Sequence, residues 1–284
     1  MTTYLRPGTL DDALAALAAQ RLTVLAGGTD FYPARVGRPL DDDVLDITAL
    51  EGLRGIRDEG DAWSIGALTT WSDLLRAELP PCFDGLKAAA REVGGVQVQN
   101  AGTLVGNLCN ASPAADGIPN LLALDAEVEL ASAAGTRRLP LAGFVVGNRE
   151  TRRGPEELVT RVVLPKPRPG AAGRFVKLGA RRYLVISIVM IAVVIEPEAS
   201  RVAAARVAVG ACSPAAHRLP ALEAALQDRA LDAALGEALS PDHLRAVLAP
   251  IDDVRASAGY RWDAAETALR RCLSELGATL GGAA

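Results

Sequence analysis

The most constraining stretch of this sequence is residues 24–30, VLAGGTD, in which a short apolar run is broken by two adjacent glycines. The apolar run predicts a strand, and Gly27 and Gly28 predict a tight turn after it, because glycine adopts positive φ without steric cost. Residues without Cβ atoms also let a ligand approach successive backbone N–H groups, which can bind an anion such as phosphate. An ordinary turn between two elements is the alternative that this stretch alone leaves open.

Signals of regular structure surround this turn and predict a small β-α-β unit. Thr9 followed by Asp12 matches the S/T-x-x-D/E pattern that starts helices, and apolar residues at helical spacing then predict about three turns of helix. Residues 23–25 and 43–47 have the composition of strands. The turn does not follow the G-x-G-x-x-G pattern of the dinucleotide-binding Rossmann fold, so that fold is not predicted.

Length and charge limit the classes of protein that fit. A chain of 284 residues exceeds the usual size of one hydrophobic core, so we expect two or three subdomains. The net charge of -4 argues against a nucleic-acid partner, which requires a basic face. No secretory signal is predicted, and the expected location is cytoplasmic. The longest apolar run, residues 184–195, is about half the length of a membrane-spanning helix, so no membrane span is predicted.

The cysteines and histidines argue against a metal centre or a histidine-based active site on this chain. Cys82, Cys109, Cys212 and Cys272 are widely separated and form no C-x-x-C pair. This spacing predicts no iron–sulfur cluster, zinc site or disulfide framework. The chain has only two histidines, which argues against a zinc hydrolase or a His-based triad.

A second informative stretch covers residues 97–116, QVQNAGTLVGNLCNASPAAD. It is rich in small and amide residues, and it predicts another glycine-bearing turn. Ser112 and Pro113 are a good N-cap and first-turn pair, so we expect a helix over residues 113–124 with Asp116 in its first turn. Taken alone, Asp116 is a carboxylate at a helix N-terminus, which contributes a few tenths to about 1 kcal/mol to stability.

The rest of the chain divides at a proline-rich connection, residues 165–170, PKPRPG. Before it, composition and periodicity predict further strands and helices: strands at 62–65 and 158–164, and helices at 71–77 and 85–92. After it, three long strands are consistent with an antiparallel meander: 174–179, 186–195 and 203–209. Residues 218–276 have helical spacing.

These stretches together resemble a known family, the FAD-binding medium subunit of molybdenum hydroxylases, which includes carbon monoxide dehydrogenase and xanthine dehydrogenase. The family's Ala-Gly-Gly-Thr-Asp loop corresponds to residues 26–30. Its segment Gln-Val-Arg-Asn-x-Gly-Thr-Ile-Gly-Gly-Asn, followed by Ser/Asp-Pro-x-x-Asp, is similar to residues 97–107 and 112–116. Supporting matches lie at residues 4–7, 65–67, 175–177, 181 and 252–261. The resemblance spans nearly the whole chain.

The resemblance implies an α+β protein with an FAD-binding fold of the vanillyl-alcohol oxidase (PCMH) type. Two FAD-binding subdomains would cover residues 1–50 and 51–168, with FAD between them. A C-terminal flavoprotein domain, residues 174–284, would hold a three-stranded antiparallel sheet packed on helices.

The resemblance also implies which residues bind the cofactor. Two glycine-bearing turns would bind the pyrophosphate from two sides through backbone N–H groups, which requires neither Arg nor Lys. The first includes Val24, Leu25, Ala26, Gly27, Gly28, Thr29, Asp30 and the apolar wall residue Phe31. The second includes Gly102, Thr103, Leu104, Val105, Gly106 and Asn107. Asp116 and Lys177 would be polar contacts of the flavin or its ribityl chain.

The sequence departs from the family pattern at three places. Val105 replaces a glycine, and positive φ at a β-branched residue would cost about 1–3 kcal/mol, so we expect a strained turn or weaker FAD binding. Gln99 replaces an arginine, which removes one charge near the second turn. Tyr183 lies in a segment that is more polar in many relatives, where it could stack near the flavin or pack as an ordinary tyrosine.

The function implied is electron transfer within a multi-subunit oxidoreductase. The sequence shows no nucleophile–base pair or paired acid–base carboxylates, so the difficult chemistry would belong to a cofactor. In relatives, a large subunit carries molybdopterin and a small subunit carries iron–sulfur clusters. The flavin on this chain would pass their electrons to an external acceptor, within a dimer of heterotrimers. The alternatives are a flavin-free scaffold or assembly subunit and a stand-alone flavin oxidoreductase.

Overall fold

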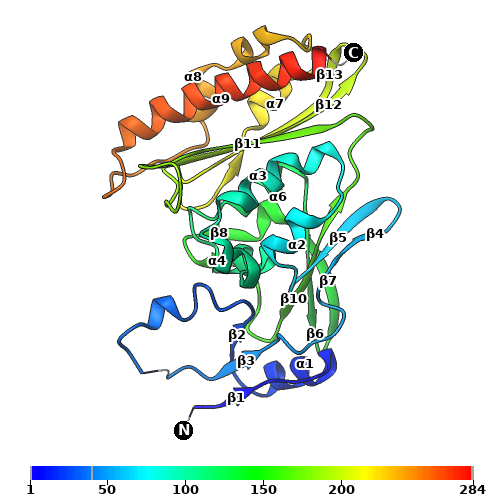
Figure 1. The fold of residues 1–284 in the computed structure, drawn as a ribbon, viewed down its shortest axis with the longest axis vertical. Helices are drawn as coiled ribbons and strands as arrows, with labels where there is room; N and C mark the ends of the chain where they lie inside the picture. Colours follow the sequence, from blue (N-terminus) through cyan, green and yellow to red (C-terminus); the bar gives the residue numbers. More distant parts are fainter. Residues whose placement is uncertain (1, 40, 283–284) are drawn as a thin grey trace.

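The computed structural model describes residues 2–39 and 41–282, which form three sheet-based units stacked along the long axis (Figure 1). The N-terminal unit lies at one end and the C-terminal unit at the other, with a five-stranded sheet and its helices between them. Each unit has a core of buried apolar side chains, and the core of the middle unit continues into the C-terminal sheet.

The N-terminal unit is a parallel sheet with one covering helix. Strands β1 (Tyr4–Leu5), β3 (Val44–Asp46) and β2 (Thr23–Leu25) pair in that order. Helix α1 (Leu10–Ala19) begins at Thr9, whose side chain accepts a hydrogen bond from the Asp12 amide at 3.2 Å. The predicted β-α-β unit is therefore confirmed. The connection after β2 contains a short 3₁₀ helix, η1 (Pro33–Arg35).

The middle unit is an antiparallel sheet with helices on one face. Its strands follow the order β4 (Ile56–Asp58), β5 (Ala62–Gly66), β10 (Leu158–Pro165), β6 (Glu127–Ser132) and β7 (Gly135–Pro140). The covering elements are α2 (Trp71–Arg76), η2 (Pro81–Phe83), α3 (Asp84–Glu92), α4 (Val96–Ala101), α5 (Leu104–Asn110) and α6 (Gly117–Ala123). A short turn η3 (Leu141–Gly143) and a hairpin of β8 (Val145–Gly147) and β9 (Glu150–Thr151) precede β10.

The C-terminal unit contains one more strand than predicted. The meander of β11 (Ala172–Leu178), β12 (Val189–Glu198) and β13 (Arg201–Gly210) is confirmed, but β14 (His217–Arg218) pairs with β13 and makes the sheet four-stranded. The expected three-stranded sheet is therefore wrong. A two-residue strand has too few residues to show the alternation that marks a strand in sequence. The helices are α7 (Pro220–Leu226), η4 (Ala233–Ala238), α8 (Pro241–Arg245) and α9 (Ala258–Gly281).

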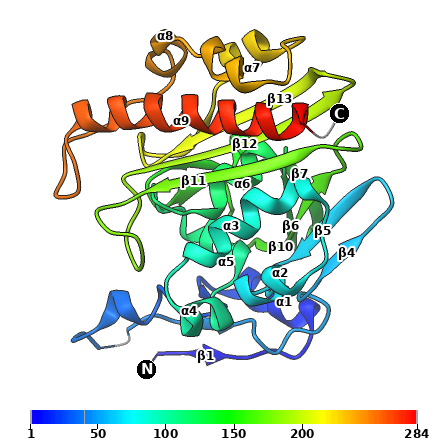
Figure 2. The same cartoon turned by 45° about the horizontal axis from the view of Figure 1, so that its top comes forward.

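Strand β12 explains the longest apolar run of the sequence. Its first eight residues are buried, because α9 packs on one face of the sheet and α3 and α6 pack on the other (Figure 2). A strand covered on both faces is apolar at successive positions rather than at alternate ones. Among the residues that the structure describes, no helix is long and apolar enough to cross a membrane.

Helix α2 begins with a capping box that predicts a pH-dependent contribution to stability. The Thr70 side chain accepts from the Asp73 amide at 3.1 Å, and the Asp73 carboxylate accepts from the Thr70 amide at 3.0 Å and from Arg54 Nε at 2.8 Å. Burial by itself raises the pKa of Asp73, but these hydrogen bonds outweigh it and lower the pKa to about 2. The stabilisation is therefore fully present above the unfolded-state pKa of about 4 and is lost as the pH falls towards 2.

We expect Asp73→Asn to lower the free energy of unfolding at pH 7 by up to about 2 kcal/mol, because it removes the negative charge that both pairs with Arg54 and strengthens the box. The difference from wild type should shrink as the pH is lowered from 5 to 3. Urea unfolding across this pH range measures it. Asp263→Asn is the control, since the Asp263 side chain is exposed and makes no hydrogen bond with the described residues. Equal pH profiles for the two variants would contradict the assignment.

Candidate functional site

A large cavity lies between the N-terminal unit and the helices of the middle unit. Its volume is about 620 Å³, within the range of cofactor and ligand sites in proteins. The first predicted stretch forms one wall: Val24, Leu25, Ala26, Gly27, Gly28, Thr29, Asp30 and Phe31. Most of the second predicted stretch forms the opposite wall: Gly102, Thr103, Val105, Gly106 and Asn107. The fold thus brings together two stretches that are more than 70 residues apart in sequence.

Gly27 and Gly28 of the first stretch are each required to be glycine, but for different structural reasons. Gly28 has φ +68°, the left-handed region expected for this turn, and a Cβ there would lie 2.7 Å from the Tyr32 ring. Gly27 permits close packing instead, because a Cβ on it would lie 2.0 Å from the carbonyl oxygen of Ala101 and 2.9 Å from Cα of Gly102. The two walls therefore contact each other directly through their backbones at this point.

Both walls offer unused hydrogen-bond donors. Within the described chain, the backbone N–H groups of residues 27–30 donate no hydrogen bond. The same holds for the amides of Thr103 and Val105 at the beginning of α5. Unpaired amides beside a cavity are costly unless water or a ligand accepts from them, and successive amides in a turn favour an anionic ligand. The site therefore fits a phosphate-bearing molecule.

The second stretch differs from the bare turn predicted for it. It forms α4 and α5, and Thr103 caps α5 by accepting from the Gly106 amide at 2.9 Å. Val105 lies in the first turn of α5, is 3% exposed and is absent from the residues with positive φ. The predicted backbone strain at Val105 is wrong, because a helical backbone suits a β-branched residue far better than a left-handed turn does.

The predicted start of the next helix is also wrong. Helix α6 begins at Gly117 rather than at residue 113, and Asp116 directly precedes it. Ser112 accepts from the Ala114 amide at 3.3 Å through its side chain and from the Ala115 amide at 2.9 Å through its carbonyl. These bonds form a local turn of the kind that competes with helix capping. The Asn107 side chain accepts from the Gly117 amide at 3.2 Å and so connects the cavity wall to α6.

Asp116 and Lys177 form a buried ion pair. Lys177 Nζ lies 2.6 Å from Asp116 Oδ2, Ser187 Oγ donates to Asp116 Oδ1 at 2.7 Å, and both charged side chains are less than 10% exposed. Burial raises the pKa of Asp116, and the ammonium of Lys177 opposes this shift. Neither residue lines the cavity, and Leu104 is buried in the core. In the structure, Asp116 and Lys177, both predicted as polar contacts of the cofactor, therefore pair with each other beside the cavity.

Several arginines of the cavity wall were not found from the sequence. They are Arg21, Arg35, Arg149 and Arg153. Arg35 pairs with Asp42 at 2.6 Å and covers the Phe31 ring at 3.8 Å. Among the described residues, Arg21 and Arg153 have no carboxylate within 4 Å, so the wall carries positive charge that favours an anionic ligand.

Arg149 connects the two walls. It has φ +58° after the β8 strand, and its Nη1 donates to Asp30 at 3.0 Å and to Asn110 at 2.6 Å. Asp30 and Arg149 are 119 residues apart, so no local pattern predicts this contact. The arginines at 149, 152 and 153 lie close together in the sequence, and this clustering could have indicated a basic wall.

Comparison with known sequences gives two family matches. Residues 1–167 match the "FAD binding domain in molybdopterin dehydrogenase", and residues 174–276 match the "CO dehydrogenase flavoprotein C-terminal domain". The putative xanthine dehydrogenase FAD-binding subunit of Escherichia coli (strain K12) is 31% identical over 98% of this chain and 97% of its own length. The nicotine 6-hydroxylase medium subunit of Paenarthrobacter nicotinovorans is 29% identical over 97% of each chain.

Comparison with solved structures also leads to this family. A chain of the carbon monoxide dehydrogenase from Hydrogenophaga pseudoflava that lacks the Mo-pyranopterin moiety has a TM-score of 0.87 and 28% identity, covering 97% of this chain and 96% of that one. The fold and the site thus define an FAD-binding flavoprotein of the oxidoreductases. The chain belongs to the FAD-binding medium subunits of the molybdenum hydroxylases. The resemblance, the α+β fold with its PCMH-type FAD-binding domain, and FAD as the cofactor are confirmed.

Proposed function

We propose that this chain is the electron-transfer subunit of a molybdenum-containing dehydrogenase. Bound FAD would supply the redox chemistry, since it exchanges electrons one or two at a time. The observation that carries the proposal is the cavity of about 620 Å³ between two walls with unpaired amides. It has the size and the donor set that a dinucleotide with a pyrophosphate linker needs.

The chain's own residues would bind and orient the cofactor. The amides of residues 27–30 on one wall, and those of Thr103 and Val105 on the other, would donate to the pyrophosphate. Phe31 would provide an apolar contact. Asp116 and Lys177 stay proposed contacts of the flavin or ribityl end, supported by the hydrogen bond between Asn107 and Gly117 that connects their surroundings to the wall.

The proposed assembly follows from the family. Iron–sulfur clusters on a small subunit would deliver electrons from a molybdopterin-binding large subunit, and the flavin would pass them to an external acceptor. The term "medium subunit" in the name of a relative supports such an assembly. A dimer of heterotrimers, a cytoplasmic location, and the division into residues 1–50, 51–168 and 174–284 remain predictions.

An absorbance spectrum of the purified protein, taken with any chains that co-purify, tests this function. We expect a flavin band after reconstitution with FAD, and iron–sulfur absorbance when two further polypeptides co-purify. A protein that takes up no FAD would instead support a flavin-free scaffold subunit. Uptake of FAD with no co-purifying chain from the native host would favour a stand-alone flavin oxidoreductase.

The bridge made by Arg149 predicts a kinetic effect on the cofactor. We expect Arg149→Gln to speed FAD release roughly two- to fivefold, because an exposed ion pair such as that with Asp30 stabilises by up to about 1 kcal/mol. Flavin fluorescence after dilution of the loaded protein measures the rate. Arg149→Lys should recover part of the effect, and Arg152→Gln, which changes a neighbouring charge outside the cavity wall, is the control. A wild-type release rate in Arg149→Gln would refute the bridging role.

A further inference from the structure

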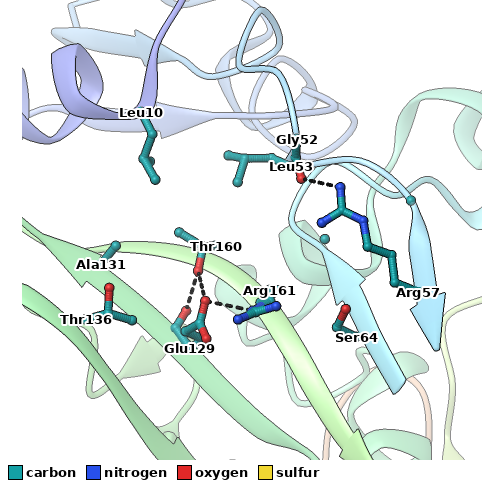
Figure 3. A pocket seen from close by; sticks show the side chains of 12 residues that line it. Leu10, Gly52, Leu53, Arg57, Ser64, Glu129, Ala131, Thr136, Thr160 and Arg161 are labelled. Atoms are coloured by element: carbon teal, nitrogen blue, oxygen red, sulfur yellow. Dashed lines mark hydrogen bonds and ion pairs between the residues drawn. The ribbon is translucent and has the colours of Figure 1, made fainter. Parts of the chain in front are cut away.

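A second cavity, of about 200 Å³, lies on the face of the middle sheet opposite the helices (Figure 3). Its walls come from the beginning of α1, the connection of residues 52–55 and strands β4, β5, β6, β7 and β10. It shares no lining residue with the cofactor cavity. Its chemistry is therefore independent of the function proposed above.

The acceptor groups in this cavity are already occupied. Glu129 is 8% exposed, and its Oε1 accepts from Thr160 Oγ1 at 3.0 Å and from Arg161 Nε at 2.8 Å. Its Oε2 accepts from Arg138 Nε at 2.9 Å. Burial by itself raises the pKa of Glu129, but these hydrogen bonds outweigh it and lower the pKa. Glu129 is thus an ionised and well-satisfied carboxylate, with little capacity to bind a further cation.

Two donor side chains of the cavity, by contrast, make one long hydrogen bond or none. Ser64 is 3% exposed, and its hydroxyl points into the cavity and makes no hydrogen bond to any described residue. Arg57 makes one long bond, 3.3 Å, from Nη2 to the carbonyl of Gly52 (Figure 3). The amides of Gly52 and Leu53 donate no bond within the described chain. Arg57 and Ser64 are direct cross-strand neighbours on β4 and β5, and both side chains line this cavity.

The charged side chains of the cavity favour an anionic ligand, as the free donors do. Arg161 pairs with Glu129 and with Glu59 at 2.7 Å, and Arg138 pairs with Glu129. Arg57 has no carboxylate within 4 Å among the residues described. One guanidinium therefore remains without a counter-ion, in a cavity that is also lined by a serine hydroxyl with no acceptor among the described residues.

We propose that this cavity binds a small oxyanion, a carboxylate or phosphate group held by Arg57 and Ser64. A guanidinium donates two parallel hydrogen bonds to either group, and a serine hydroxyl can donate a third. The volume limits the ligand to a small molecule or to one terminal group of a larger one.

Calorimetric titration of the full-length protein with inorganic phosphate, and separately with acetate, tests the proposal. FAD must be present in excess, so that the anion cannot enter the cofactor cavity. We expect saturable binding of at least one anion, and the stronger of the two identifies the group. Arg57→Gln should weaken binding about tenfold and Ser64→Ala severalfold, because each removes donors that no other residue replaces.

Arg76→Gln is the matched control, since it removes one exposed arginine charge that lies outside the cavity. It should bind the anion as the wild type does. Both test residues allow mild substitutions, because Arg57 is exposed and Ser64→Ala removes one atom. Absence of binding of either anion, or equal loss in all three variants, would overturn the proposal. Anion binding that disappears only when FAD is added would assign the anion to the cofactor cavity and overturn it as well.

Discussion

Gly27→Ala is expected to weaken FAD binding by roughly ten- to a hundredfold. A Cβ at residue 27 would lie 2.0 Å from the carbonyl oxygen of Ala101, so the two walls of the cofactor cavity must separate. A backbone cannot yield as a flexible side chain can, and overpacking of this kind costs about 1–3 kcal/mol. The separation would also displace the unpaired amides on both walls from a shared ligand.

Fluorescence titration of the reconstituted protein with FAD measures this effect, and thermal unfolding of the FAD-free protein shows whether the fold survives. Gly8→Ala is the matched control, because a Cβ at residue 8 meets no atom within 4 Å. It should bind FAD as the wild type does. Normal FAD affinity in a folded Gly27→Ala protein would mean that contact between the walls is not required for binding.

Lys177→Met should cause the largest loss of stability of the single changes considered for this chain, about 3–5 kcal/mol at neutral pH. The change leaves the buried carboxylate of Asp116 with only the hydroxyl of Ser187 as partner. Without the ammonium, the pKa of Asp116 rises further above its ordinary value. Below about pH 4 the carboxyl is protonated in both the folded and the unfolded protein, so the penalty should shrink there and grow as the pH rises.

Urea unfolding at several pH values measures this loss. Lys166→Met is the control, because Lys166 pairs with Asp58 on the surface, where an ion pair contributes at most about 1 kcal/mol. Adding Asp116→Asn to Lys177→Met should recover part of the stability, since it removes the uncompensated charge. Equal losses in the Lys177 and Lys166 variants at every pH would contradict a buried ion pair.

The first half of the cofactor site could be predicted because its signals are local. Thr9, the strand β2 and the glycines after it each specify backbone geometry within a few residues. The prediction of the second half failed at Thr103 and Ser112. Both side chains carry a hydroxyl group that can cap a helix. Thr103 caps a helix, and Ser112 closes a turn instead. Tertiary packing decides between these outcomes, and a single sequence does not contain it.

Contacts between distant residues account for the rest of what the sequence did not predict. Arg149 meets Asp30 only after the chain has formed the N-terminal and middle units. The ion pair of Asp116 and Lys177 was not predicted either, because residues 61 positions apart meet only in the folded chain, in a buried position where an unpaired charge would be costly. The strand β14 exists only because the edge of β13 offers it a partner.

Helices α3 and α6 lie against the C-terminal sheet, so the middle and C-terminal units share one core. This arrangement determines how the molecule responds to a break in the backbone. One continuous core joins Ile65 and Val128 of the middle sheet to Met190 and Ala208 of the C-terminal sheet. Cutting the backbone at the proline-rich connection would therefore not free two independent pieces, because each would expose an apolar surface that only the other covers. The nicked halves should stay associated and melt in a single transition, like two subunits of an obligate dimer.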